Sequence, residues 1–570
     1  MEEEYNMQMN GGEAIVQSLV QAGIQYVFGI VGSSVLEVFD LLPQTDLNYV
    51  GVRHEQVGGH MADAYARVSG QPAVCLVQNG AGLTNLVTAV ATAYRARSPL
   101  IVISGSPTSK QLFTEAYQEI DHVHIMKPIT KWSHLVNRAD RIAEAIQQAI
   151  RESLSPPYGP TFVDVPRDFL YEIADVRIEK PTQFMAAHRC PPDSAALEQA
   201  VLQLQQAHSP VILVGGGIAW AQASEEVGTL ATRLSAPICT TYGHNDAVPN
   251  NHPWYVGSLG RGGSKAAMES FRRADLILAL GTRMDPFSFL PYYGEPYFPH
   301  NAAIIQVAND PRQIGKNYPI TLGIVADAKL FAQSVLARLG SQSDSMTSLQ
   351  QVQEWRTKWQ QEMAAQSQWS GHGSLSMEAA YAALAEILPA HTIRTVDIGS
   401  SPSFAYSMLS YSGPRTLLPP LGLGGVGFSL PAALGAKLAA PERPVVALMG
   451  DGAFSMSFSA LFTAVEYAIP IVGIVFDNAA WGAEKANQQY FYDANYVGTN
   501  LHSPDLVRLA SAMDVHASSA ETPSDIKKAV LAALQRKDRA SIIRIPVDPE
   551  RFPLPARRDA LKKPERHVYR

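Results

Sequence analysis

Two stretches of sequence, PVVALMGDGAFSM at Pro444–Met456 and IVGIVFDN at Ile471–Asn478, decide the fold. Each begins with a continuous apolar run of strand length, which is typical of a strand buried on both faces of a parallel sheet. Each run ends in the turn residues Gly, Asp or Asn, and a helix is expected from about Ala453. Because ligands bind at the carboxyl ends of strands in open parallel sheets, Asp451 and Asn478 are expected at a binding edge.

The residue types at this edge predict a site for a metal ion and a diphosphate. The carboxylate of Asp451, the amide oxygen of Asn478 and the backbone carbonyl of Ala480 are hard oxygen ligands that suit Mg²⁺. Gly450 and Gly452 let the backbone approach a diphosphate closely, and the following helix directs free N–H groups toward it. A turn in which Asp451 caps the helix would explain Gly-Asp-Gly alone. The second strand, which ends in Asn478, favours the binding site over a simple helix cap.

The rest of the chain repeats this alternation in three blocks, which predicts three doubly wound parallel-sheet α/β domains. The expected strands of the first block are Tyr26–Gly32, Leu47–Val52, Ala73–Gln78 and Leu100–Ser104, with helices at Glu55–Ser69 and Leu83–Arg95. Further strands are expected at Val211–Val214, Leu276–Leu280, Ile304–Val307 and Arg394–Ile398. The outer blocks look alike and the middle one differs.

The domain boundaries follow from shifts in composition. A Pro-rich stretch at 156–181 is interpreted as the exit from the first block, and a Gln- and Ser-rich stretch as a linker that carries one helix. We therefore expect domains at 1–180, 190–340 and 375–547, a linker at 341–374 and a tail at 548–570.

The composition excludes several classes of protein. A net charge of −7 gives no reason to expect nucleic acid or an anionic membrane as partner. Three cysteines predict neither a disulfide framework nor a cysteine metal site. No apolar run approaches the roughly 18–20 residues that span a bilayer, and the acidic start resembles no signal peptide, so a cytoplasmic protein is expected. Charged residues make up only 17% of the chain, which indicates extensive burial within it or against another subunit.

Gly-Asp-Gly followed by Asn after a strand–helix–strand interval resembles the thiamine-diphosphate-dependent decarboxylases, acetohydroxyacid synthases and acyltransferases. The resemblance implies pyrimidine-binding, central and diphosphate-binding domains, with thiamine diphosphate and Mg²⁺ as cofactors and Asp451, Asn478 and Ala480 as metal ligands. It also implies a glutamate that bonds N1′ of the aminopyrimidine and favours the imino form that acts as base. Glu55 fits this role, because a charge-assisted bond strengthens in a dry pocket. Pairing of Glu55 with Arg53 or His54 at the surface is the alternative.

Other segments match the same family. Val426, in the Gly-rich loop 422–427, matches the apolar residue beneath the folded cofactor, although relatives often carry a larger side chain; a plain turn before a helix from Pro431 is the alternative. Loops at 29–32, 79–82 and 117–119 match those that approach the thiazolium and the substrate. The residues implied as catalytic are Glu55, Gln118, Gly32 and Val426. Those implied as cofactor-binding are Glu55, Gly80, Gly424, Val426, Gly450, Asp451, Gly452, Ala453, Asn478 and Trp481.

Within this family, three segments are similar to the sulfoacetaldehyde acetyltransferases: Trp481–Lys485, Leu290–Pro299 and the tail Arg557–Pro564. The similarity implies that sulfoacetaldehyde and phosphate give acetyl phosphate and sulfite. Fixed cations suit two anionic reactants, and Lys485, Arg558 and, with less support, Arg261 are the candidates. Each is equally explained as a surface charge.

The rival reading is an acetolactate synthase-like carboligase or 2-oxo acid decarboxylase acting on pyruvate. The sequences RHEQ, EAYQE and Ile314–Asn317 look synthase-like. Such synthases often hold FAD in the central domain, but Gly215–Gly217 lacks the third glycine of a dinucleotide fingerprint, so we expect no FAD. A catalytically inactive paralogue is disfavoured because Glu55, Asp451 and Asn478 are all present. The family resemblance further implies a homodimer or homotetramer with the active site at the dimer interface, taking a small aldehyde or 2-oxo acid and possibly phosphate.

Overall fold

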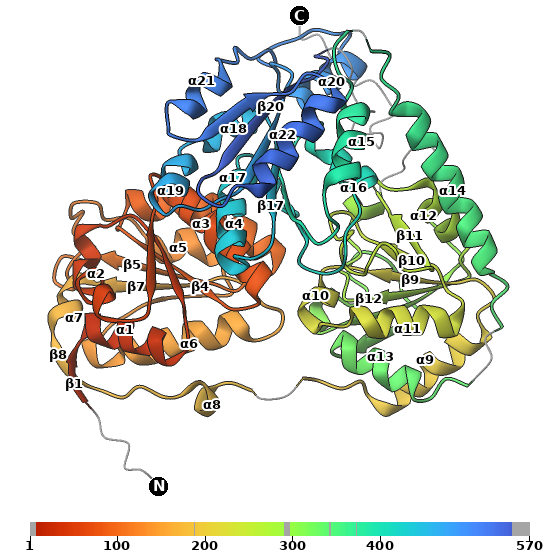
Figure 1. Cartoon of the computed structure of the whole chain (residues 1–570). Coiled ribbons are helices and arrows are strands. Elements are labelled where there is room, and N and C mark those ends of the chain that lie inside the picture. Colours follow the sequence, from red (N-terminus) through yellow and green to blue (C-terminus); the bar gives the residue numbers. More distant parts are fainter. Residues whose placement is uncertain are drawn as a thin grey trace, which may run out of the picture.

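The computed structural model describes residues 7–186, 189–260, 262–289, 297–340, 344–371 and 373–549. It contains three α/β domains, each built on a six-stranded parallel sheet with helices on its faces (Figure 1). The predicted fold class is therefore confirmed. In Figure 1 the N-terminal domain lies at the left, the central domain at the right and the C-terminal domain at the top.

The N-terminal sheet has the strand order β3-β2-β4-β5-β7-β6. Its strands are β2 (Tyr26–Gly29), β3 (Asn48–Gly51), β4 (Ala73–Val77), β5 (Leu100–Ser106), β6 (Trp132–Leu135) and β7 (Thr161–Pro166). Its helices are α1 (Gly11–Gln21), α2 (Leu36–Leu41), α3 (Glu55–Ser69), α4 (Ala81–Ala96), α5 (His122–Met126), α6 (Ile142–Leu154) and α7 (Arg167–Tyr171). A separate antiparallel pair joins β1 (Met7–Asn10) to β8 (Ile173–Val176). Every residue of β4 and β5 is buried, as expected for central strands covered on both faces.

The central sheet has the strand order β11-β10-β9-β12-β13-β14. Its strands are β9 (Pro210–Val214), β10 (Ile238–Thr240), β11 (Tyr255–Ser258), β12 (Leu276–Leu280), β13 (Ala303–Ala308) and β14 (Leu322–Val325). Its helices are α9 (Ser194–Gln206), α10 (Gly217–Ala221), α11 (Ser224–Leu234), α12 (Lys265–Arg272) and α13 (Ala328–Leu336). The short α8 (Pro181–Phe184) lies on the segment that enters this domain, and α14 (Leu349–Gln366) is the helix expected in the linker.

The C-terminal sheet has the strand order β16-β15-β17-β18-β20-β19. Its strands are β15 (Ile393–Val396), β16 (Leu417–Leu418), β17 (Val445–Gly450), β18 (Val472–Asp477), β19 (His516–Ser519) and β20 (Ser541–Pro546). Its helices are α15 (Met377–Ile387), α16 (Ala405–Met408), α17 (Ser429–Ala439), α18 (Asp451–Ser457), α19 (Ala460–Glu466), α20 (Gly482–Phe491), α21 (Leu506–Ser511) and α22 (Pro523–Gln535).

The outer domains share one topology. When strands are numbered along the chain within each domain, both outer sheets read 2-1-3-4-6-5, whereas the central sheet reads 3-2-1-4-5-6. The strand order reverses between β2 and β4, between β9 and β12, and between β15 and β17. In open α/β sheets, the crevice for a ligand forms at this reversal.

The outer domains also pack directly on each other. Apolar side chains of α3, α4, α17 and α19 belong to one hydrophobic core, whereas the central domain has a core of its own. The closest approach joins α3 to α17: a Cβ added to Gly435 would lie 1.9 Å from the carbonyl oxygen of Met61. The Tyr467 hydroxyl accepts from the N–H of Gly51 at 2.7 Å, and the Thr463 hydroxyl donates to the Gly51 carbonyl at 3.1 Å. The two domains therefore form one packed unit.

One sequence interpretation was wrong. The Pro-rich stretch at 156–181 is not simply an exit, because it contains β7, which pairs with β5 and β6 inside the first sheet. The prolines flank this strand rather than interrupting its ladder, apart from Pro166 at its end, where proline is tolerated. Separately, among the described residues no helix is long and apolar enough to cross a membrane.

Candidate active site

Asp451 lies where the sequence predicts it, at the carboxyl end of β17. Gly450 pairs with Phe476 of β18, so the two strand ends lie side by side, and Asp451 is the first residue of α18. Its side chain is buried, with 3% exposure. The Ser503 hydroxyl donates to Oδ2 at 2.8 Å, while the other carboxylate oxygen, Oδ1, is buried and has no hydrogen-bond partner. A buried oxygen of this kind is costly unless a ligand satisfies it.

The electrostatics at this edge favour a cation. The pKa of Asp451 is raised to about 6, chiefly by burial and to a smaller extent by the nearby charge of Asp477, although the hydrogen bond from Ser503 lowers it. A bound divalent cation would stabilise the carboxylate that burial destabilises. Asp477 itself accepts a hydrogen bond from the Nε of Arg544 at 2.6 Å.

The other expected ligands follow β18 closely. Ala480 and Asn500 face each other in an isolated antiparallel β-bridge. The two hydrogen bonds of this bridge run from the N–H of Trp481 to the Thr499 carbonyl and from the N–H of Leu501 to the Ala479 carbonyl. The Ala480 carbonyl therefore takes no part in the bridge. The side chain of Asn478 lies beside Gly482: a Cβ added to Gly482 would be 2.8 Å from the side-chain amide nitrogen of Asn478. Among the described residues no group of three or more His, Cys, Asp and Glu could hold a metal ion. The donor types of Asp451, Asn478 and Ala480 are one carboxylate, one amide and one backbone carbonyl, all hard oxygen ligands of the kind that Mg²⁺ prefers.

Trp481 packs on the start of α18. A Cβ added to Gly452 would lie 2.5 Å from the indole ring, so only a glycine admits the ring at this distance. Gly450 adopts an extended conformation as the N-cap of α18 and offers no side chain to cap the helix; the Gly452 amide lies close enough to the Asp451 carboxylate to lower its pKa, and the Ala453 amide follows in the same first turn.

The Gly-rich loop that carries Val426 is held by a buried carboxylate that the sequence analysis did not single out. Asp397, which follows β15, accepts hydrogen bonds from the backbone N–H groups of Gly427 at 3.0 Å and Ser429 at 2.8 Å. Burial raises its pKa to about 6 although these bonds lower it. Val426 is partly buried against the core shared by the outer domains, and Gly424 has a φ of +77°. The loops after β15 and β17 thus meet at the strand reversal of this sheet.

Glu55 is the first residue of α3 and is 8% exposed. The alternative of a surface pair is wrong, because Arg53 bonds to Glu466 and the His54 ring accepts from the N–H of Gln56. Oε2 of Glu55 instead accepts from the amide of Asn85, on α4, at 2.9 Å.

Three loops of the N-terminal domain converge beside α4. Gln78, at the end of β4, accepts from the N–H of Ser34 at 2.9 Å and donates to Oε1 of Gln118 at 2.8 Å. A Cβ added to Gly32 would lie 2.4 Å from Oε1 of Gln78, and one added to Gly80 would lie 2.5 Å from the carbonyl oxygen of Gln118. The structure therefore brings together Gly32, Gly80 and Gln118, with Gln78 as the link that the sequence reasoning missed.

Of the candidate cations, Lys485 lies within the described residues. Lys485 lies on α20 and is buried, and its ammonium group is 5.2 Å from the ring centroid of Tyr496. Such a contact suits a desolvated cation. Arg558, the tail 550–570, Arg261 and the segment 290–296 lie outside the described residues.

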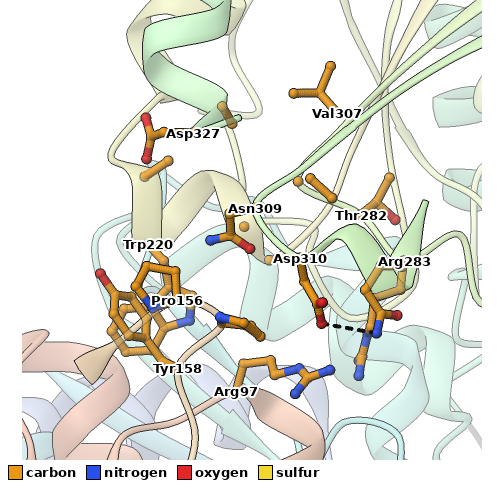
Figure 2. Close-up of a pocket in the computed structure, with 18 of the residues that line it drawn as sticks. Arg97, Pro156, Tyr158, Trp220, Thr282, Arg283, Val307, Asn309, Asp310 and Asp327 are labelled. Atoms are coloured by element: carbon orange, nitrogen blue, oxygen red, sulfur yellow. Dashed lines mark hydrogen bonds between the residues drawn. The ribbon is translucent and has the colours of Figure 1, made fainter. Parts of the chain in front are cut away.

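A separate cavity of about 460 Å³ lies at the strand reversal of the central sheet, against the N-terminal domain (Figure 2). Tyr158 and Trp220 form one side of it, and Arg97 and Arg283 lie at another. Desolvation lowers the pKa of Arg283 to about 10.

Comparison with known proteins connects these observations to described families. Family models for thiamine pyrophosphate enzymes match the chain at residues 9–125 (N-terminal TPP binding domain), 197–335 (central domain) and 397–545 (C-terminal TPP binding domain). The chain is 37% identical to the sulfoacetaldehyde acetyltransferase of Rhodobacter capsulatus, over 98% of this chain and 97% of that protein. It is 35% identical to the sulfoacetaldehyde acetyltransferase of Alcaligenes xylosoxydans xylosoxydans, over 98% of this chain and 96% of that protein. It is 33% identical to a probable acetolactate synthase large subunit of Methanocaldococcus jannaschii, over 95% of this chain and 92% of that protein.

Proposed function

Because the chain belongs to the thiamine pyrophosphate enzymes and is an acyltransferase that depends on this cofactor, we propose that it converts sulfoacetaldehyde and phosphate into acetyl phosphate and sulfite. The observation that carries the proposal is the 37% identity to a sulfoacetaldehyde acetyltransferase over nearly the full length of both chains. In the proposed reaction the aldehyde carbon loses its proton, the carbon–sulfur bond breaks and sulfite leaves with its electron pair, the former CH₂ carbon takes up a proton to become a methyl group, and the resulting acetyl group is transferred to a phosphate oxygen.

When bound, the cofactor supplies a carbon nucleophile and an electron sink for this reaction. We propose that Asp451, Asn478 and the carbonyl of Ala480 hold a Mg²⁺ ion that anchors the diphosphate. The unpartnered Oδ1 of Asp451 supports this assignment. The first amides of α18 face the same edge and would add hydrogen bonds to the diphosphate.

At the other end of the cofactor, Glu55 would hydrogen-bond the aminopyrimidine ring. Asn85 keeps Oε2 of Glu55 in place, and Gly82 lies so close to Oε1 that an added Cβ would be 3.3 Å away. A carboxylate fixed by packing and a second hydrogen bond loses little freedom on binding. Val426 would support the folded cofactor from below, since Asp397 restrains its loop.

We propose that Lys485 receives one of the two anionic reactants, because it is buried on α20, the helix that begins four residues after Asn478. Arg558 remains the second candidate and is proposed on family resemblance alone. A lysine suits this task as a compact charge that can form up to three hydrogen bonds to sulfonate or phosphate oxygens.

We further propose that two copies of the chain form the active site between them. Phe113 and Tyr117, on the loop of Gln118, are each 88% exposed, and Val497, after α20, is 70% exposed. Large apolar side chains exposed beside functional loops mark a surface that another protein covers. Sedimentation of the loaded enzyme should show a dimer or a larger oligomer, and a fully active monomer would contradict this proposal.

The proposed reaction is tested by product analysis. The purified enzyme with thiamine diphosphate and Mg²⁺ is incubated with sulfoacetaldehyde, with and without phosphate, and separately with pyruvate. Sulfite release that depends on phosphate, together with acetyl phosphate, supports the proposal. Acetolactate or carbon dioxide from pyruvate would instead support an acetolactate synthase-like enzyme. This second candidate function is favoured by the 33% identity to a probable acetolactate synthase.

The central cavity bears on FAD, which we expect to be absent. The free faces of the glycines after β9 are filled by protein: an added Cβ on Gly216 would lie 2.5 Å from His244, and one on Gly217 would lie 2.7 Å from Gly281. These glycines pack the two crossover loops together on their Cβ side while they also line the cavity of about 460 Å³, so the expectation rests on the missing third glycine of the dinucleotide fingerprint. Flavin absorbance in the purified protein would contradict this expectation.

A further inference from the structure

His122 is a buried histidine whose two ring nitrogens are both engaged. It lies on α5, is 2% exposed, and its Nδ1 lies 3.0 Å from Oδ2 of Asp164, on β7. Its Nε2 lies 2.9 Å from the backbone nitrogen of Gly80, whose N–H points at it. An amide N–H can only donate, so Nε2 must accept, and the ring proton is therefore on Nδ1 and donated to Asp164. The network fixes one neutral tautomer.

Gly80 needs such an anchor. Its backbone has φ +61° and ψ −105°, a combination that residues with a side chain avoid. Its carbonyl accepts from the N–H of Thr84 at 3.0 Å, and the N–H of the preceding Asn79 donates to the Ser34 hydroxyl at 3.2 Å. The Gly80 N–H contact with His122 joins this loop directly to α5 and, through Asp164, to β7, whereas the Asn79 side-chain amide bonds the carbonyl of Gln118, which lies before α5.

The position of Gly80 determines the position of α4, because Gly80 is the N-cap of that helix. α4 carries Gly82, which faces Oε1 of Glu55, and Asn85, which donates to Oε2 of Glu55. A continuous set of contacts therefore runs from Asp164 through His122 and Gly80 to the carboxylate proposed to activate the cofactor.

Asp164 is suited to hold the histidine in this state. It is buried, and desolvation raises its pKa, while the hydrogen bond from His122 lowers it. Its other oxygen, Oδ1, is buried without a hydrogen-bond partner, and the nearby Ser106 hydroxyl lowers the pKa further, so the contact with His122 is the one that reaches α5. Removal of the imidazole would leave Asp164 and the Gly80 amide both unsatisfied.

We propose that His122, oriented by Asp164, is a positioning residue that anchors the Gly80 amide and through α4 sets the place of Glu55. The anchoring of the Gly80 amide by His122 rests on the contacts alone, whereas the effect of His122 on turnover rests on the proposed function. The histidine itself touches no reactant, because both of its nitrogens are used and its side chain is buried.

Two variants separate these contacts. In His122→Asn the amide is short, so it can still bond Asp164 but does not reach Gly80. In His122→Gln the longer side chain places its carbonyl oxygen near the position of Nε2 and restores an acceptor for the Gly80 amide. His124→Asn is the matched control, because His124 lies on the same helix with an exposed side chain.

The first measurement is deuterium uptake of the segment around Gly80 in the protein without cofactor. We expect His122→Asn to exchange roughly ten times faster there, with His122→Gln and His124→Asn close to wild type. Unchanged exchange in His122→Asn would overturn the anchoring role, whatever reaction the enzyme catalyses.

The second measurement is turnover of the loaded enzyme. We expect kcat of His122→Asn to fall about tenfold, which corresponds to about 1.4 kcal/mol, with the dissociation constant of thiamine diphosphate nearly unchanged and kcat rescued by His122→Gln. Faster exchange with unaltered kcat would overturn the link to Glu55. A wild-type protein that turns over neither sulfoacetaldehyde nor pyruvate would contradict the proposed function and leave the exchange result to decide the anchor.

Discussion

Replacement of Gly435 by alanine should uncouple the two outer domains. Wherever an alanine fits, the loss of a helical glycine stabilises a helix by about 0.5–1 kcal/mol. At Gly435 the new Cβ would lie 1.9 Å from the Met61 carbonyl oxygen, and contacts under 3.0 Å essentially do not occur, so α3 and α17 must separate by more than an ångström. Overpacking of this kind costs typically 1–3 kcal/mol, and here the neighbour is rigid backbone.

The matched control is Gly58→Ala on α3. Its added Cβ would meet the side chain of Val52 at 3.4 Å, an ordinary contact, so the helical gain should remain. We expect a net loss of about 2 kcal/mol for Gly435→Ala, which lowers Tm by about 3 °C for a packed unit of roughly 350 residues, whereas Gly58→Ala should leave Tm unchanged or raise it slightly.

The assay is thermal unfolding followed by calorimetry, with transitions of the central domain as the internal reference, because that domain has its own core. If Gly435→Ala and Gly58→Ala shift the same transition equally and in the same direction, the close approach of α3 and α17 is not what limits this interface, and the reasoning fails.

Three further predictions concern the site and its electrostatics. Glu55→Ala should leave thiamine diphosphate bound with little change in calorimetric affinity, while turnover collapses by at least about a hundredfold, because the aminopyrimidine loses its partner. Asp451→Ala should abolish Mg²⁺-dependent binding of thiamine diphosphate in the same titration, because a metal ligand is lost. Asp246 is buried with a pKa raised to about 6, so the native state takes up its proton more readily than the unfolded state, and stability should fall as pH rises from about 4 to 6. Denaturant unfolding at a series of pH values should show the free-energy difference between wild type and Asp246→Asn falling by up to about 3 kcal/mol over this range, because Asp397 and Asp451, whose pKa values are also raised to about 6, contribute equally to both proteins.

The outcomes that would contradict these predictions are distinct. Equal loss of activity with unaltered cofactor binding in Glu55→Ala and Asp451→Ala would mean that the two roles are misassigned. A stability difference between wild type and Asp246→Asn that is flat between pH 4 and 6, or that has the opposite slope, would mean that the backbone N–H groups of Thr416 and Leu417 outweigh the burial of the carboxylate.

The sequence predicted those parts of the fold that depend on local pattern. Continuous apolar runs ending in Gly, Asp or Asn identified β17 and β18, and so placed Asp451 at a strand end. Partners that lie far apart in the chain were not predictable in this way. Asn85, Ser503 and Asp397 are common polar residues in ordinary sequence surroundings, and only the folded sheet brings them to Glu55, Asp451 and the loop of Val426.

The alternative of surface pairing for Glu55 rested on local charge alone. Arg53 and His54 are adjacent in sequence, but Arg53 bonds Glu466, the His54 ring accepts from Gln56, and Glu55 accepts from Asn85, so the three side chains have different partners. The prolines around β7 misled for a similar reason: their local effect on the backbone is real, but they bound a strand that tertiary pairing stabilises.

The shared 2-1-3-4-6-5 order of the outer sheets bears on how such a chain arose. α3 follows the second strand of its sheet and α17 follows the second strand of the other, so the helices that meet at Gly435 are counterparts. Duplication and fusion of a self-associating ancestor would leave such counterparts in face-to-face contact. In the present chain the two halves differ in chemistry, because Glu55 lies in one and the proposed metal ligands Asp451 and Asn478 lie in the other.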